Sequence, residues 1–194
     1  MSSNRVLSPV FLLRKREALL IEAIILGCLV PSIYSAYTDA TKRYLYDYIT
    51  IPIFLAGLIY SIYTSNWMNI VTAVVVFAIF MIFALKGGIA GGDVKFTTAL
   101  AIWFGYPSII YLIAIASMLA FVFGSIMLFK KGLFTKRMVP FFKGIYYRFM
   151  YGVNVIPENK LPENEEISDE AVPFGTFLVI GAWLVYLLQS GVIA

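Results

Sequence analysis

The stretch "FMIFALKGGIAGGDVKFTTALAIWF", residues 80–104, joins two strongly apolar runs through a short glycine-rich segment that carries Lys86, Asp93 and Lys95. An apolar run of about 20 residues is long enough to cross the hydrocarbon core of a bilayer as a helix. An ionised carboxylate close to a bilayer is costly, so Asp93 is by default a candidate functional residue. The stretch therefore predicts a membrane helix, a break, and a second helix with an acid at its start.

The composition of the whole chain is that of an integral membrane protein. Of 194 residues, 61% are hydrophobic and 13% are charged, whereas soluble domains have about 45–50% apolar residues. We expect one all-α membrane domain over residues 1–194, with a polar loop at 130–172 and a short fourth helix that reaches only part way across. The apolar runs and their Gly/Pro breaks predict about six membrane helices, at about 18–37, 48–63, 67–85, 94–104, 108–129 and 174–194.

Residue types that the sequence lacks exclude several kinds of site. Histidine is absent and Cys28 is the single cysteine, so an internal disulfide, a multi-cysteine zinc site and histidine-based catalysis are excluded. Catalysis would have to use carboxylates, hydroxyls, lysines or this one thiol. The polar loop interleaves bases with aromatic residues in "FFKGIYYRFMYG", residues 141–152, which is typical of a helix in the lipid headgroup region. We therefore expect the lipid bilayer, and no nucleic acid, as a partner.

Lysine and arginine are distributed unevenly among the predicted connectors. Most of them fall after the first, third and fifth helices, and cytoplasmic connectors are enriched in these residues. This pattern predicts that Asp39 and Asp93 lie at the cytoplasmic face. The basic cluster at residues 14–16 favours the opposite orientation.

Asp39 and Asp93 lie at the same predicted depth, at the end of the first helix and the start of the fourth. Two carboxylates that share a site cannot both ionise cheaply, so one keeps its proton. In aspartic proteases the ionised member activates a water and the protonated member polarises the scissile carbonyl. Because the dipole of a helix N-terminus favours an anion, Asp93 is predicted to ionise more readily. Alternatively, each aspartate only caps a helix end at the water interface.

The glycines beside Asp93 suit the approach of an extended substrate. Glycine lacks a Cβ and tolerates positive φ, so Gly88, Gly91 and Gly92 are predicted to form a flexible loop that contacts substrate. Lys95 is assigned to the same substrate-binding region. Asp47 opens the second predicted helix, where it would be an N-cap or a further substrate contact.

Three short segments resemble one family. "AGGDVK", residues 90–95, resembles the GxGD motif of membrane aspartic proteases, and "GGDVK" resembles the form found in type IV prepilin peptidases. "TDATKRYLYDYITIP", residues 38–52, resembles the segment after the first helix of that family. "VPFGTFLVIGA", residues 172–182, is similar to the "PFGPFL" stretch that opens its last helix. The resemblance implies that Asp39 and Asp93 are the catalytic pair.

Two positions qualify the resemblance. Ala90 stands where GxGD has its first glycine, and Gly88 and Gly91 would have to supply the lost flexibility. Tyr46 and Asp47 resemble the YD of presenilins and signal peptide peptidases, which makes Asp47 a rival first aspartate. Those families have longer chains and a PAL motif, which this sequence lacks.

The resemblance implies a membrane-embedded aspartic endopeptidase that needs no metal or cofactor. It would remove the short basic leader of class III signal peptides, from prepilin-like or preflagellin-like precursors, at the cytoplasmic face. Bacterial members carry a cysteine-rich insert and an N-methyltransferase activity; without those cysteines, the chain is similar to the smaller archaeal preflagellin (archaellin) peptidases, which do not methylate. Glu165 or Glu166 in the polar loop could attract the basic leader.

Two other classes of protein compete with the peptidase. In a small cation or proton-coupled carrier, Glu22, Asp39 and Asp93 would bind the ion or relay protons. In a non-catalytic membrane subunit, the glycines would serve only helix packing.

Overall fold

The structure is a computed structural model that describes residues 22–87, 89–130, 132, 139, 143, 146, 147, 150 and 172–190. The chain divides into two compact units, Met1–Ser117 with Pro173–Ala194, and Met118–Val172. Most of the second unit lies outside the described residues, including nearly all of the predicted polar loop with Glu165 and Glu166. The packing described below is that of the first unit.

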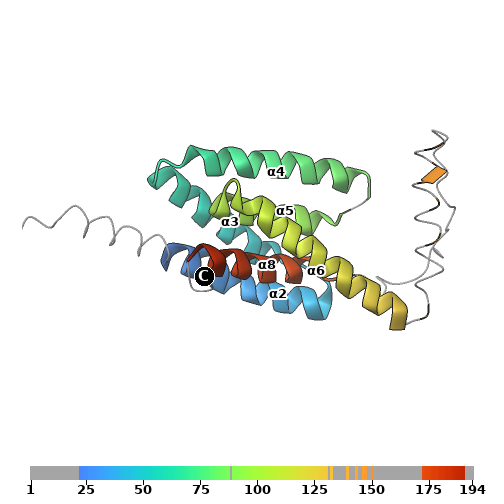
Figure 1. Cartoon of the computed structure of the whole chain (residues 1–194). Helices are drawn as coiled ribbons and strands as arrows, with labels where there is room; N and C mark the ends of the chain where they lie inside the picture. The colour runs from blue at the N-terminus through green and yellow to red at the C-terminus, as the bar shows by residue number, and fades with distance from the viewer. Residues whose placement is uncertain are drawn as a thin grey trace, which may run out of the picture. The chain divides into compact units, whose positions relative to one another are not determined.

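The described residues form helices and no strands, which confirms the all-α prediction for this part of the chain. Three of the described helices are long and apolar enough to cross a bilayer, namely Glu22–Lys42, Trp67–Leu85 and Ser108–Lys130. Asp47–Tyr63 and Phe174–Gln189 are shorter apolar helices. In chain order (Figure 1), the elements are η1 (Ile25–Leu29), α2 (Val30–Lys42), α3 (Asp47–Tyr63), α4 (Trp67–Leu85), α5 (Gly91–Phe104), α6 (Ser108–Lys130) and α8 (Phe174–Gln189).

The outer surface of these helices is that of a multi-pass membrane protein. On α4, large apolar side chains such as Val74, Ile82 and Leu85 are exposed. In water such a surface would be an aggregation hazard, whereas in a bilayer it contacts lipid.

The first helix ends later than the sequence predicts. It was expected to end at residue 37, but it continues through Thr38 and Asp39 to Lys42. The Thr38 hydroxyl donates to the Ser35 carbonyl at 3.0 Å, so this polar side chain is satisfied on the helix itself. The helix ends at Arg43, which adopts the left-handed conformation and donates its N–H to the Asp39 carbonyl at 3.0 Å.

A π-helical turn, η1, precedes α2. It ends at Leu29, two residues before Pro31, whose ring clashes with the carbonyl four residues earlier in an α-helix. The widened turn accommodates the proline and keeps the helix continuous, with Cys28 and Leu29 fully buried.

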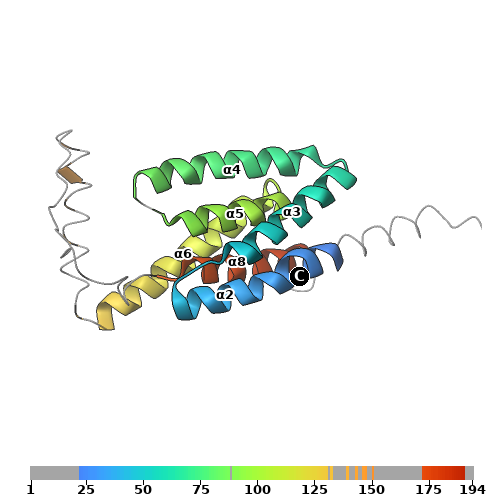
Figure 2. The ribbon, with the colours of Figure 1, turned by 180° about the vertical axis from the view of Figure 1, so that it is seen from behind.

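Helix α5 lies at the centre of the first unit, between α4 and the pair formed by α2 and α8 (Figures 1 and 2). From Phe96 to Trp103 every side chain of α5 is buried. A helix of 14 residues is about 21 Å long, which is less than the roughly 30 Å of the hydrocarbon core. This helix therefore depends on its neighbours α3, α4 and α8 for shielding.

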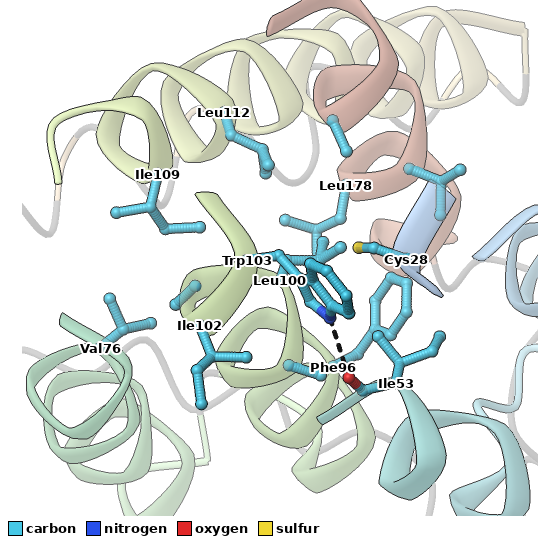
Figure 3. Packing of buried hydrophobic residues seen from close by; sticks show 14 of the residues in the cluster. Cys28, Ile53, Val76, Phe96, Leu100, Ile102, Trp103, Ile109, Leu112 and Leu178 are labelled. Atoms are coloured by element: carbon cyan, nitrogen blue, oxygen red, sulfur yellow. Dashed lines mark hydrogen bonds between the residues drawn. The ribbon is translucent and has the colours of Figure 1, made fainter. Parts of the chain in front are cut away.

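Trp103 fastens α5 to α3. Its Nε1 donates to the Ile53 carbonyl at 2.9 Å (Figure 3), and its ring stacks on Tyr60 with centroids 5.3 Å apart. Close packing is possible because Gly57 has no side chain, since a Cβ there would lie 2.7 Å from the Trp103 Nε1. This contact holds the C-terminal half of α5 against α3.

Candidate active site

Asp39 lies on a buried polar face of α2. Ser32, Ser35, Thr38 and Asp39 recur every three or four residues and are all buried, with Asp39 6% exposed. This spacing puts them on one side of the helix, and α2 packs against α8. The polar face of α2 is therefore part of the protein interior and does not face solvent.

The first turn of α8 holds the Asp39 carboxylate. The Thr176 N–H donates to Asp39 Oδ2 at 2.8 Å, and the Thr176 hydroxyl lies 3.1 Å from the same oxygen. Gly175 makes this approach possible, because a Cβ at that position would lie 3.1 Å from Oδ2. The resemblance to "PFGPFL" covers this segment, but it does not predict that Thr176 is a partner of Asp39.

Asp93 lies in the first turn of α5, a helix that is not among the candidate membrane spans. Burial, and after it the negative charge of Asp39, raise the pKa of the Asp93 carboxyl from 3.8 to about 7. The two aspartates, which are far apart in sequence, are therefore close enough to interact. At neutral pH a large share of Asp93 is protonated.

That Asp93 is the more readily ionised aspartate stays a prediction, against which its raised pKa argues. The prediction rests on the helix dipole, which contributes about 0.3–1 kcal/mol at an exposed helix N-terminus. One pKa unit corresponds to about 1.4 kcal/mol, so the dipole offsets less than one unit. Loss of hydration and the Asp39 charge outweigh it at Asp93.

Leu45 connects the two aspartate-bearing segments. This buried side chain, from the turn between α2 and α3, contacts both Gly92 and Gly175. A Cβ at Gly92 would lie 3.3 Å from the Leu45 Cβ, and a Cβ at Gly175 would lie 3.0 Å from Leu45 Cδ1. Since Gly92 precedes Asp93 and Gly175 lies beside Asp39, Leu45 packs between the two aspartate-bearing segments.

The glycine-rich stretch is more regular than the predicted loop. Gly91 and Gly92 form the first turn of α5, so the expectation that they belong to a flexible loop is wrong, because the helix begins before Asp93 and not after it. Gly88 lies outside the described residues. Ala90 is the N-cap residue with φ −71° and ψ 145°, a conformation open to any L-residue. Alanine in place of the first GxGD glycine therefore introduces no backbone strain.

Asp47 and Lys95, both assigned to the substrate-binding region, pair with each other. Lys95 Nζ lies 2.7 Å from Asp47 Oδ2, and both side chains are about half exposed. Asp47 is the first residue of α3, and the N-cap is Tyr46, so the N-cap assignment of Asp47 is wrong. The ion pair links the start of α3 to the first turns of α5, beside Asp93.

Breaking this ion pair is expected to have a small effect. Exposed pairs contribute about 0–1 kcal/mol, so Asp47→Asn and Lys95→Gln should lower the melting temperature in detergent only slightly and leave catalytic turnover within a few fold of wild type. Thermal unfolding and an activity assay on both variants measure this. Complete loss of turnover in Asp47→Asn, with the protein folded, would make Asp47 the first catalytic aspartate.

The acidic residues of the described segments do not gather into a metal site. No group of three or more His, Cys, Asp or Glu side chains that could hold an ion occurs there. Glu22 lies 17 positions before Asp39 in one continuous helix, which separates the two by about 25 Å. A carrier site that uses Glu22 together with Asp39 and Asp93 is incompatible with this separation.

Comparison with known proteins identifies the family. Residues 24–125, just over half of the chain, match the model of the type IV leader peptidase family. The chain belongs to the type IV leader peptidase family. The matched region contains Asp39, Leu45 and Asp93 and ends before α8, so the contribution of Thr176 comes from the structure alone.

One relative in this family extends well beyond the chain. The prepilin leader peptidase/N-methyltransferase of Xanthomonas campestris pv. campestris is 31% identical over 181 residues, which cover 84% of this chain and 48% of the relative. The chain thus spans about half the length of this curated family member. No solved structure matches the chain.

Proposed function

We propose that this protein is a membrane aspartic endopeptidase that cleaves the leader from prepilin-like precursors, with Asp39 and Asp93 as its catalytic dyad. The observation that carries the proposal is that the two carboxyls share a site, where burial, and after it the charge of Asp39, raise the pKa of Asp93 to about 7. A pair with one ionised and one protonated member near neutral pH has the composition that peptide hydrolysis requires.

The proposed reaction uses the two carboxyls as base and acid. The ionised carboxylate takes a proton from water as the water oxygen attacks the scissile carbonyl carbon, and the protonated carboxyl gives its proton to the carbonyl oxygen. The tetrahedral intermediate then collapses, the C–N bond breaks, and the amine nitrogen takes up a proton. The chemistry needs no metal or cofactor.

We place the dyad at the cytoplasmic face. The connectors at the dyad end of the described bundle carry Arg43 and Lys86, and Lys42 and Lys95 lie beside them. The connectors at the opposite end, residues 64–66 and 105–107, contain no charged residue. This asymmetry supports a cytoplasmic site by the enrichment of Lys and Arg on that side.

Two finer details belong to the same proposal. The substrate is a precursor with a short basic leader, prepilin-like or preflagellin-like, and Glu165 and Glu166 attract that leader. The protein does not methylate its product, because the family resemblance ties methylation to a cysteine-rich insert and Cys28 is the single cysteine of this sequence. The X. campestris relative is named for both activities, so methylation has to be assayed directly.

Co-expression with precursors that carry a basic leader before an apolar segment tests the proposed function. We expect a mobility shift and, by mass spectrometry, a new unmethylated N-terminus. The matched control is the same precursor with neutral residues in place of the leader bases. If no such precursor is cleaved by membrane-inserted protein, the peptidase proposal fails; a methylated product would contradict only the finer assignment.

A further inference from the structure

Both Thr176 donors bind one of the two oxygens of the Asp39 carboxylate, and the Gly175 backbone N–H also interacts with this carboxylate. The Thr176 N–H and the Thr176 hydroxyl both lie within hydrogen-bond distance of Oδ2, at 2.8 and 3.1 Å. Two donors on one oxygen fix the plane of the carboxylate. The other carboxylate oxygen, Oδ1, accepts neither of these two bonds.

The position of Thr176 in α8 leaves its N–H free to donate to Asp39. It is the third residue of α8, so its N–H belongs to the first turn, where N–H groups have no acceptor within the helix. The N-cap residue of α8, Pro173, offers no side-chain cap. Asp39 therefore caps α8 from a different helix, and a helix N-terminus favours the anionic form of such a cap.

The Thr176 hydroxyl has a second acceptor within reach. Its oxygen lies 3.0 Å from the Ala36 carbonyl, one turn before Asp39 on α2. A hydroxyl carries a single proton, which it can give to Ala36 or to Asp39. The backbone N–H has no such choice, so it bonds Oδ2 in either case.

We propose that Thr176 is a positioning residue for the proposed peptidase reaction, which holds Asp39 through Oδ2 as the ionised member of the dyad and directs Oδ1 to the attacking water. Asp39 is then the base, and Asp93, to which the described residues offer no such donor pair, is the acid. Hydrogen bonds to a charged group are among the strongest in proteins. This inference rests on the proposed function for its catalytic part and on the α2–α8 contact for its structural part.

The geometry also explains the glycine before Thr176. A Cβ at Gly175 would lie 3.0 Å from two Leu45 methyl carbons and 3.1 Å from Asp39 Oδ2. Both contacts are tighter than ordinary packing, so a side chain there would push the first turn of α8 away from Asp39. The missing Cβ allows the Thr176 donors to reach the carboxylate.

Thr176→Val and Thr176→Ser form the matched pair that tests the proposal. Val keeps the shape and the N–H but removes the hydroxyl, whereas Ser keeps both donors. We expect Val to lower kcat about tenfold, a typical loss for one charge-assisted hydrogen bond, with KM unchanged, and Ser to restore most of kcat. A wild-type kcat in Val, or a change confined to KM, would overturn the catalytic part of the proposal.

A second measurement does not depend on activity. In a double-mutant cycle, Thr176→Val should lower the melting temperature by about 2–4 °C when Asp39 is present and by clearly less in the Asp39→Ala background. Additive effects would show that Thr176 and Asp39 are not coupled and would overturn the proposal. If wild type cleaves no precursor while the cycle shows coupling, the peptidase function fails and the α8–Asp39 contact stands.

Discussion

Asp39→Asn and Asp93→Asn should each lower the rate of precursor cleavage by at least about 10²–10⁴-fold, the usual contribution of one general acid or base. Asparagine has nearly the shape of aspartate but can neither take a proton from water nor give one to a carbonyl. If both groups belong to one proton-transfer system, the double variant should be no slower than the slower single variant.

Single-turnover cleavage of a purified precursor, followed by gel mobility, measures this effect. Asp47→Asn is the matched control, since it removes a neighbouring carboxylate that pairs with Lys95. Thermal unfolding of each variant separates loss of chemistry from loss of fold. Retention of more than about a tenth of wild-type rate in Asp93→Asn, well above the loss expected for a lost acid, would contradict the dyad.

Cleavage should also decline on the alkaline side of neutrality. The pKa of Asp93 is raised to about 7, so its acid form predominates below that pH and is lost above it. If this form donates the proton in the rate-limiting step, kcat should fall about tenfold for each pH unit above 7. A rate that stays constant from pH 7 to 9 would exclude Asp93 as the acid.

The pH dependence of folding stability should reflect the titration of Asp93 as well. Asp93 binds its proton more tightly in the folded than in the unfolded chain, where its pKa is near 3.8. Its contribution to stability is therefore fully present below that value and is lost as the pH rises through about 7. In Asp39→Asn the neighbouring charge is gone, so the upper end of this transition in the melting temperature should move to lower pH. An unchanged transition would mean that the two carboxyls do not interact.

The sequence predicts helices best where an apolar run meets clear breaks. Helix α4 begins at Trp67 after a short polar turn and ends before Lys86 and Gly87, because few residues at either border suit the membrane interior. The end of α2 differs from the prediction because the polar residues Thr38 and Asp39 have the local pattern of a connector but belong to the helix. Their burial depends on α8, more than 130 positions away, and no local pattern carries that information.

The candidate site likewise has residues that the sequence predicts and features that it does not. Asp39 and Asp93 stand out in the sequence because carboxylates are rare beside apolar runs. Which of them keeps the proton depends on burial and on donors from other segments, neither of which a rule based on helix ends includes. The sequence does not point to Thr176, because its donors matter only through Asp39, although Thr176 lies inside the segment, residues 172–182, that resembles the family.

Ala90 bears on how such proteins are searched for. Any residue fits the backbone at position 90, because φ is −71°, whereas a Cβ at Gly92 or Gly175 would lie 3.3 or 3.0 Å from Leu45, tighter than ordinary packing. A steric pattern would therefore favour two missing β-carbons, at 92 and 175, and would require an aspartate after the first of them. Such a pattern would retrieve chains that a strict GxGD search discards, and it would reject chance GxGD strings that lack the second glycine.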